Sequence, residues 1–300
     1  MERLLSATSR NRRALLITFG LTLLYSLIEI IGGILTNSLA LLADAGHMLA
    51  DVGGLALALF AAWMSQKPAT PAKTYGYYRV EILAALINAL GLLLLSFYIL
   101  YEAYQRFQAP PKVASLPMLV VATLGLLVNL IGIWNLREGA KESLNVQGAF
   151  LEVVSDLLGS MGVIVAGLIM WKTGWYYADP IFSMLIGLFI LPRTWKLLTQ
   201  TINVLLEGTP THIDVSAVEQ EMLKVPGVTA VHDLHIWTIT SGIEALSAHI
   251  VLGETIEPQA ASKVIETLAA RVKEKFGINH ITIQIESPQL EKCNEKGICR

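Results

Sequence analysis

The chain has 300 residues, of which 54% are hydrophobic and only 15% are charged, and its mean hydropathy is +0.56. Soluble globular domains carry about 25% charged residues, so this composition argues against an ordinary soluble enzyme and excludes a disordered or collagen-like chain. The net charge of −2 argues against a nucleic-acid-binding protein, which would carry a basic surplus.

Charge divides the chain into two parts. Residues 1–206 carry 25 charged side chains and a net charge of +3, whereas residues 207–300 carry 21 charged side chains and a net charge of −5. The first composition is typical of a lipid-embedded chain and the second of a soluble domain. We therefore expect a transmembrane domain over 1–206 and a cytosolic domain over 207–290.

Six apolar stretches of the first part are long enough to cross a bilayer, which takes about 20 residues. They run over 14–35, 39–64, 80–105, 116–136, 148–171 and 178–200. The first is too long for a signal peptide and contains Glu29, so we interpret it as a retained helix. Lysine and arginine are biased eleven to three toward the flanks that lie inside when the N-terminus is inside. Both termini are therefore expected in the cytoplasm.

The second part has the pattern of a small α/β domain. Apolar periodicity, β-branched runs and Gly or Pro boundaries predict five elements. They are a helix over 215–225, strands over 228–240 and 243–252, a helix over 258–276 and a strand over 280–286. This αββαβ order is close to the ferredoxin-like class. A sheet of three strands is small for an independent domain, so we expect the chain to form a dimer.

Both cysteines, Cys293 and Cys299, lie in the last eight residues, where they cannot form a disulfide framework. We expect residues 291–300 to be a disordered tail, with metal binding as the alternative.

Ionisable side chains recur inside two of the apolar stretches, where they are costly and usually mark a transport path. Asp44, His47 and Asp51 share one stripe of the second helix, at 100° per residue. Glu152 and Asp156 form an i, i+4 pair on the fifth helix. Two helices packed 8–10 Å apart could bring His47, Asp51, Glu152 and Asp156 together as a four-coordinate site for a divalent metal.

A structural hydrogen-bonding role is the alternative for any single acidic residue in these stretches. Asp44 fits better beside the ligands than among them. We favour structural roles for Glu29, Asn88, Asn129 and Asp179, and Asp179 could cap the last helix.

Four segments resemble the cation diffusion facilitator family. The second helix carries SLALLADAGHMLAD (38–51), and the loop before the third helix carries YGYYRVEILAA (75–85). The fifth helix carries LEVVSDLLGS (151–160), and the cytosolic part carries HDLHIW (232–237). The resemblance covers residues 10–290, and within the family it is strongest to bacterial cobalt–zinc–cadmium resistance exporters.

The resemblance implies six transmembrane helices, a cytosolic αββαβ domain, a homodimer in the bacterial inner membrane, and alternating-access exchange of a divalent metal for protons. It implies transport ligands at His47, Asp51, Glu152 and Asp156. The fifth helix of the family usually carries His at the position of Glu152, which weakens the case for strict zinc selectivity. Zinc is the expected substrate, followed by cadmium and cobalt, and no prosthetic group is implied.

The resemblance also implies cytosolic metal ligands at His232, His249 and Glu286, for zinc as a regulatory ligand. Another ligand position of the family carries Gln284 here. His280 begins the last strand and is a further candidate. His232 and His235 are an odd number of residues apart, so on a regular strand they point to opposite faces and would not share a metal.

In the family, a basic residue before the third helix meets an acidic residue after the sixth, which implies a pair between Arg79 and Glu207.

Other functions are less consistent with these residues. A membrane metalloprotease would require His-Glu-x-x-His, which the sequence lacks, and a sensor would not require ligands inside the bilayer. A passive metal channel and a same-family exporter of manganese, iron or nickel stay open as alternatives.

Overall fold

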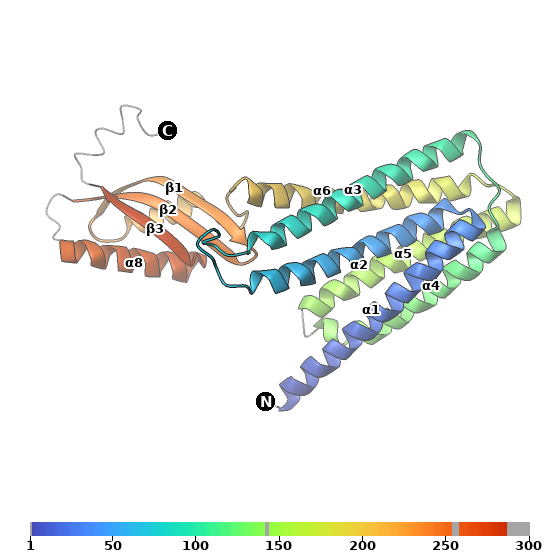
Figure 1. Ribbon diagram of the computed structural model, residues 1–300, viewed down its shortest axis with the longest axis horizontal. Coiled ribbons are helices and arrows are strands. Elements are labelled where there is room, and N and C mark those ends of the chain that lie inside the picture. The colour runs from blue at the N-terminus through green and yellow to red at the C-terminus, as the bar shows by residue number, and fades with distance from the viewer. Residues whose placement is uncertain (1, 142–143, 254–257, 287–300) are drawn as a thin grey trace. The chain divides into compact units, whose positions relative to one another are not determined.

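The computed structural model describes residues 2–141, 144–253 and 258–286 (Figure 1). Its first part contains six long helices and a short 3-10 turn, η1 (Gly139–Lys141). The helices are α1 (Glu2–Thr36), α2 (Leu39–Ser65), α3 (Arg79–Gln108), α4 (Ser115–Leu136), α5 (Leu144–Thr173) and α6 (Ala178–Leu205). Each contains a stretch long and apolar enough to cross a membrane, which confirms the six predicted spans.

Large apolar side chains lie exposed along these helices. Leu35, Leu94 and Trp134, for example, are 78%, 70% and 66% exposed. Water-soluble monomers rarely expose extended apolar surface, whereas lipid tails solvate such side chains. The chain is therefore a multi-pass membrane protein.

Small residues allow α4 to approach both α1 and α5, and these helices lie side by side (Figure 1). A Cβ atom added at Gly125 of α4 would overlap the phenol of Tyr25 on α1. One added at Gly132 would lie 3.0 Å from a methyl group of Val153 on α5. Such contacts are common between membrane helices, where close packing replaces the hydrophobic effect as the driving force.

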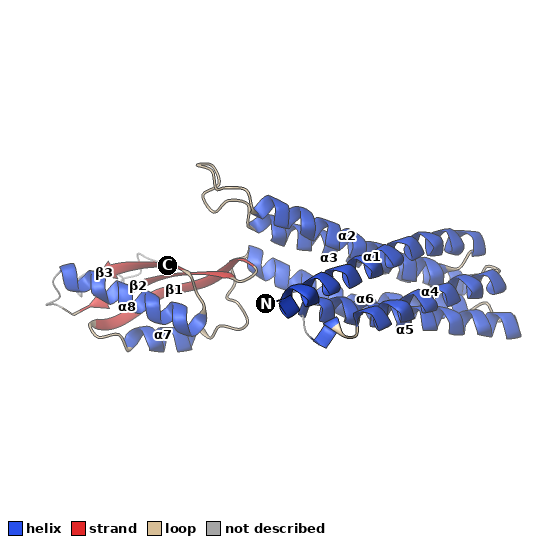
Figure 2. Cartoon of the chain, turned by 90° about the horizontal axis from the view of Figure 1, so that it is seen from below, coloured by secondary structure: helices blue, strands red, loops and turns tan. Residues whose placement is uncertain are grey.

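The last part of the chain forms the predicted αββαβ domain. Its elements are α7 (Val215–Leu223), β1 (Val228–Thr240), β2 (Ile243–Leu252), α8 (Pro258–Phe276) and β3 (His280–Glu286). The sheet order is β1-β2-β3, with β1 antiparallel and β3 parallel to β2. Both helices cover one face of the sheet (Figure 2). Their apolar side chains Val218, Met222 and Leu268 form a core with Leu246 and Ile250 of β2.

The described residues divide into two compact units. One contains Met1–Leu59 and Ile87–Leu198, and the other contains Phe60–Leu86 and Thr199–Arg300. The second unit thus takes one end of α2, α3 and α6 together with the α/β domain. The domain boundary at residue 206 stays a prediction, and the tail over 291–300 lies outside the described residues.

Candidate functional site

Three of the predicted transport residues meet within the first unit. His47 and Asp51 lie one turn apart on α2, with 3.5 Å between His47 Nδ1 and Asp51 Oδ2. One ligand atom from each of His47, Asp51 and Glu152 of α5 lies within 4.8 Å of the other two. His47 Nδ1 and Asp51 Oδ2 are buried and form no hydrogen bond within the described part of the chain. We call these three residues the transport cluster.

Asp156 lies one turn beyond Glu152 on α5 and is only 3% exposed. It is not a member of the group whose ligand atoms lie within 4.8 Å of one another. Its Oδ1 atom is buried and, among the described residues, has no hydrogen-bond partner. The structure therefore brings together three of the four predicted transport ligands and leaves the fourth carboxylate one turn away.

The sequence analysis missed the cation that contacts this cluster. Arg193 of α6 donates from Nη1 to Glu152 Oε1 at 2.7 Å and from Nη2 to Glu152 Oε2 at 2.6 Å. Arg193 lies well inside α6, within the apolar stretch predicted over 178–200. An arginine within a predicted apolar stretch was the signal that could have identified it.

Asp44 lies on the same stripe of α2 but outside the transport cluster. Its Oδ2 accepts a hydrogen bond from Ser160 Oγ at 3.3 Å, and its carboxyl group contacts Glu29. Ser160 in turn accepts one from Asn129 Nδ2 at 3.3 Å, and Tyr25 donates to Glu29 at 3.0 Å. Buried side chains of α1, α2, α4 and α5 are thus connected by polar contacts, as the structural reading of Glu29 and Asn129 predicts.

A cavity of about 330 Å³ lies beside the cluster, between α2, α5 and α6. Asp44, His47 and Ser155 supply polar lining, and most of the remaining wall is apolar, including Phe182 and Phe189. The cavity therefore reaches His47 of the transport cluster.

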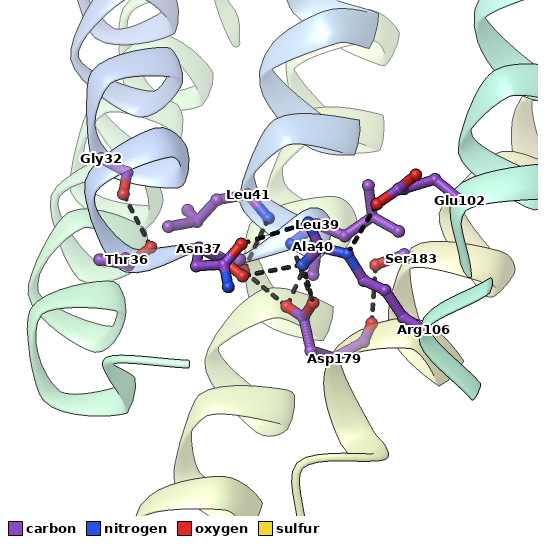
Figure 3. A network of polar contacts seen from close by, with 11 residues as sticks. Gly32, Thr36, Asn37, Leu39, Ala40, Leu41, Glu102, Arg106, Asp179 and Ser183 are labelled. Atoms are coloured by element: carbon purple, nitrogen blue, oxygen red, sulfur yellow. Dashed lines mark hydrogen bonds and ion pairs between the residues drawn. The ribbon is translucent and has the colours of Figure 1, made fainter. Parts of the chain in front are cut away.

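Asp179 caps a different helix from the one we expected (Figure 3). Its carboxylate accepts hydrogen bonds from Ser38 Oγ at 2.6 Å and from the N–H groups of Leu39 and Ala40 at 2.8 and 3.2 Å. Arg106 of α3 lies 3.5 Å away. The first N–H groups of α2 have no partner within their own helix, so a buried carboxylate from α6 satisfies them. This contact fixes the start of the helix that carries His47 and Asp51.

The cytosolic residues His232, His249 and Glu286 meet on three neighbouring strands. His232 is paired with His249 in the β1–β2 register, and Glu286 lies opposite Val251 in the β2–β3 register. Glu286 Oε2 lies 3.2 Å from His232 Nε2, and Glu286 Oε1 lies 2.9 Å from His249 Nδ1. One ligand atom from each lies within 4.8 Å of the others. We call these residues the cytosolic cluster.

Asp233 is a second residue that the sequence analysis missed. Its Oδ2 atom lies 3.7 Å from His232 Nδ1 and 3.6 Å from His249 Nδ1. Its φ angle of 48° is left-handed, and the β1 register shifts between His232 and His235. Such a bulge inserts one extra residue into a strand and re-aims its side chains. Asp tolerates left-handed backbone better than most residues, but strand periodicity gives no sign of a bulge.

The same bulge overturns the expected orientation of His235. His232 and His235 are three residues apart on β1, but their partners His249 and Ser247 are two apart on β2. Residues two apart on a strand point to the same face, so His232 and His235 also share a face. His235 is nevertheless exposed and is not in the cytosolic cluster.

The expectation that His280 lies near these ligands is wrong. It begins β3, opposite Ala245, whereas Glu286 ends the strand. Six residues of strand separate them by about 20 Å. The His280 ring instead packs edge-on against Tyr75, with 6.3 Å between ring centroids.

The pair implied between Arg79 and Glu207 is present in the second unit. Arg79 Nη2 donates to Glu207 Oε1 at 2.9 Å. Nearby, Glu81 accepts hydrogen bonds from Thr240 at 2.5 Å and Ser241 at 2.7 Å.

Two family models match almost the whole chain. Residues 15–206 match the cation efflux transmembrane domain, and residues 210–288 match the cytoplasmic domain of cation efflux proteins. The chain belongs to the cation diffusion facilitator family. Its fold and membrane location agree with this assignment, and members of this cation efflux family are transporters rather than enzymes.

Several relatives of this cation diffusion facilitator are similar over most of their length. The metal cation efflux system protein CzcD of Cupriavidus metallidurans is 48% identical over 95% of this chain and 89% of its own. The cadmium, cobalt and zinc/H(+)-K(+) antiporter of Bacillus subtilis is 44% identical over 92% of this chain and 89% of its own. The zinc transporter ZitB of Escherichia coli is 40% identical over 92% of this chain and 88% of its own.

Proposed function

We propose that this cation efflux protein exports zinc, and also cadmium and cobalt, in exchange for protons. The observation that carries the proposal is the transport cluster, where an imidazole and two carboxylates meet inside apolar helices. Ionisable groups at such positions are rare and mark ion pathways. The names of two relatives support the choice of metals: the one with 44% identity is named for cadmium, cobalt and zinc, and the one with 40% identity for zinc.

The donor set suits a divalent metal of intermediate softness. Zinc is bound by imidazole nitrogen and carboxylate oxygen with four ligands in a tetrahedron. His47, Asp51 and Glu152 supply three, and we assign the fourth to Asp156, whose buried Oδ1 has no hydrogen-bond partner among the described residues. A small rotation of α5 would bring this carboxylate toward the ion. The oxygen-rich set also admits cadmium and cobalt.

Proton coupling follows from the chemistry of these ligands. Metal binding requires a neutral imidazole and ionised carboxylates, so metal and protons compete for the same atoms. Metal leaves the site on the outer side, protons replace it, and the protonated site returns. Alternating access by movement of helices against one another suits a site built between α2 and α5. In this scheme both termini face the cytoplasm, and the protein lies in the bacterial inner membrane.

We assign a regulatory metal to the cytosolic cluster. Two imidazoles and one carboxylate are a common zinc donor set, and Asp233 is placed to act as a fourth ligand. The αββαβ domain would hold the homodimer together, and metal bound there would strengthen the dimer.

Metal flux into proteoliposomes tests the proposed function. An imposed pH gradient should drive zinc uphill in the wild type, and Asp51→Ala should abolish this flux. Glu266→Gln, an exposed acidic residue of α8 outside both clusters, serves as the control and should transport normally. A protein that only dissipates zinc gradients would be a channel. If manganese, iron or nickel is preferred over zinc in competition, that metal is the substrate instead. Full transport by Asp51→Ala would refute the site.

A further inference from the structure

The proposed exchange leaves one charged contact of the transport cluster unused. Arg193 binds both carboxylate oxygens of Glu152, at 2.7 and 2.6 Å, while Glu152 also belongs to the cluster. Two parallel charge-assisted N–H to oxygen bonds of this kind are among the strong hydrogen bonds that a carboxylate makes. Any metal that uses Glu152 therefore meets an oxygen pair that is already engaged.

The charges of the transport cluster explain why the guanidinium of Arg193 lies beside it. Asp51 and Glu152 bring two carboxylates close together between apolar helices, and like charges in such surroundings repel strongly. The guanidinium of Arg193 offsets one of them. When a doubly charged metal arrives, the guanidinium becomes a like charge beside it, and its N–H groups already occupy one lone pair on each oxygen of Glu152. Metal and Arg193 therefore compete for Glu152.

Arg193 is free to move when it is displaced. Its side chain is 62% exposed on the surface of the helices, so it can leave Glu152 without repacking a core, provided that water or lipid headgroups solvate the guanidinium. Pro192 precedes it inside α6. Proline lacks the N–H that would bond to the carbonyl four residues earlier, so helices bend at such positions. A small bend of α6 at this turn would carry Arg193 away from α5.

We propose that Arg193 is a built-in competitor for the metal: it holds Glu152 when the transport site is empty and must be displaced for a divalent cation to bind. The proposal rests on the proposed function. By competing, Arg193 lowers the affinity of the transport cluster for metal. This explains how an acidic cluster can bind its substrate weakly enough to release it.

Cadmium binding to the full chain in lipid nanodiscs, measured by calorimetry at one pH, tests this. The cytosolic cluster is first disabled by His232→Ala and His249→Ala, and the two thiols of the tail are removed by Cys293→Ser and Cys299→Ser, so that the remaining heat reports the transport site. In this background Arg193→Gln should tighten cadmium binding about tenfold, equivalent to about 1.4 kcal/mol. Arg193→Lys keeps the charge but cannot make two parallel hydrogen bonds to Glu152. Its Kd should lie between that of the background protein and that of Arg193→Gln.

Two controls make the result specific. Arg137→Gln removes a cation that packs on Trp134 and does not contact the cluster, so it should leave Kd unchanged. In a Glu152→Gln background, Arg193→Gln should tighten binding by much less than tenfold, because the competition for the carboxylate is lost and only charge repulsion remains. Unchanged or weaker binding by both Arg193 variants would overturn the proposal, since a purely structural role predicts weaker binding. If Asp51→Ala leaves binding intact, the proposed function fails first, independently of Arg193.

Discussion

The two candidate metal-binding clusters of this protein use similar side chains on different scaffolds. The transport cluster takes two residues from α2 and one from α5, and within the described residues no backbone hydrogen bond joins these helices to each other. The cytosolic cluster takes one residue from each of three strands that are joined to one another by backbone hydrogen bonds. These hydrogen bonds fix the distance between ligands, whereas helices can slide or tilt and separate theirs. A helix-held site suits release, and a strand-held site suits retention.

The largest expected effect is a loss of zinc flux, which should differ between substitutions in the two clusters. His47→Ala should lower zinc flux into proteoliposomes by more than about 100-fold, since loss of even an outer contact of a metal site costs 10–100-fold. His249→Ala should reduce flux far less, because the regulatory site carries no transported ion. Equal losses from both variants would contradict the division of roles.

The second prediction concerns a substitution that should push the two helices of the transport cluster apart. A Cβ atom at Gly159 of α5 would overlap the buried carboxylate of Asp44 on α2. Gly159→Ala should therefore destabilise the protein by about 1–3 kcal/mol, as overpacking of a core does, and lower its thermal unfolding temperature.

Gly148→Ala on the same helix is the matched control, because no atom lies within 4 Å of its added Cβ. It should leave the unfolding temperature unchanged or raise it, since alanine is the better helix former. A Gly159→Ala protein as stable as Gly148→Ala would show that α2 and α5 are not held at this distance.

A third prediction concerns the bulge beside the strand-held cluster. Asp233→Asn keeps a residue that tolerates the left-handed backbone and removes the carboxylate that faces both histidines. Zinc affinity of the cytosolic cluster should fall about tenfold, a typical loss for a supporting metal contact. Calorimetry in the Asp51→Ala background measures it, with Glu266→Gln on the exposed face of α8 as control. Unchanged affinity would exclude Asp233 from the site.

The smallest effect is a pH dependence outside both clusters. Glu221 of α7 lies between Lys275 at 2.7 Å and Lys224 at 3.1 Å, and these ammonium groups lower its pKa from the ordinary value of 4.5. A lowered pKa in the folded state stabilises the fold fully above the unfolded pKa, and this contribution disappears as pH falls through the folded value.

Hydrogen exchange of the β2 amides measures this contribution. Glu221→Gln should increase exchange near pH 7, and the difference from the wild type should disappear as the pH falls through the lowered pKa of Glu221 in the folded state. A difference that persists in acid would show that Glu221 acts through packing rather than charge.

The sequence predicted the elements well because their signals are local. The bounds of β1, β2, α8 and β3 agree with the predicted ranges, since proline, glycine and apolar periodicity mark them within the chain itself. The helix expected over 215–225 ends at Leu223, where Pro226 and Gly227 already interrupt the backbone pattern. The meeting of His47, Asp51 and Glu152 was predictable because i, i+4 spacing defines one helix face.

The errors concern contacts between distant segments. The capping of α2 by Asp179 and the pairing of Arg193 with Glu152 join residues 140 and 41 positions apart, respectively, and no local pattern encodes them. The bulge at Asp233 reverses the parity on which the orientation of His235 depended. His280 was expected near the other ligands because it begins the same strand as Glu286, but an extended strand carries its two ends far apart.

The cap on α2 has a mechanical consequence. Asp179 ties the first turn of α2 to α6, with Arg106 of α3 alongside, so this end of the bundle acts as a fulcrum. Asp51 lies twelve residues along α2 from Leu39, a lever arm of about 18 Å. A swing of about 10° around the fulcrum displaces Asp51 by about 3 Å, more than the length of a zinc–oxygen bond. Leverage of this kind converts a slight tilt into complete loss of a ligand.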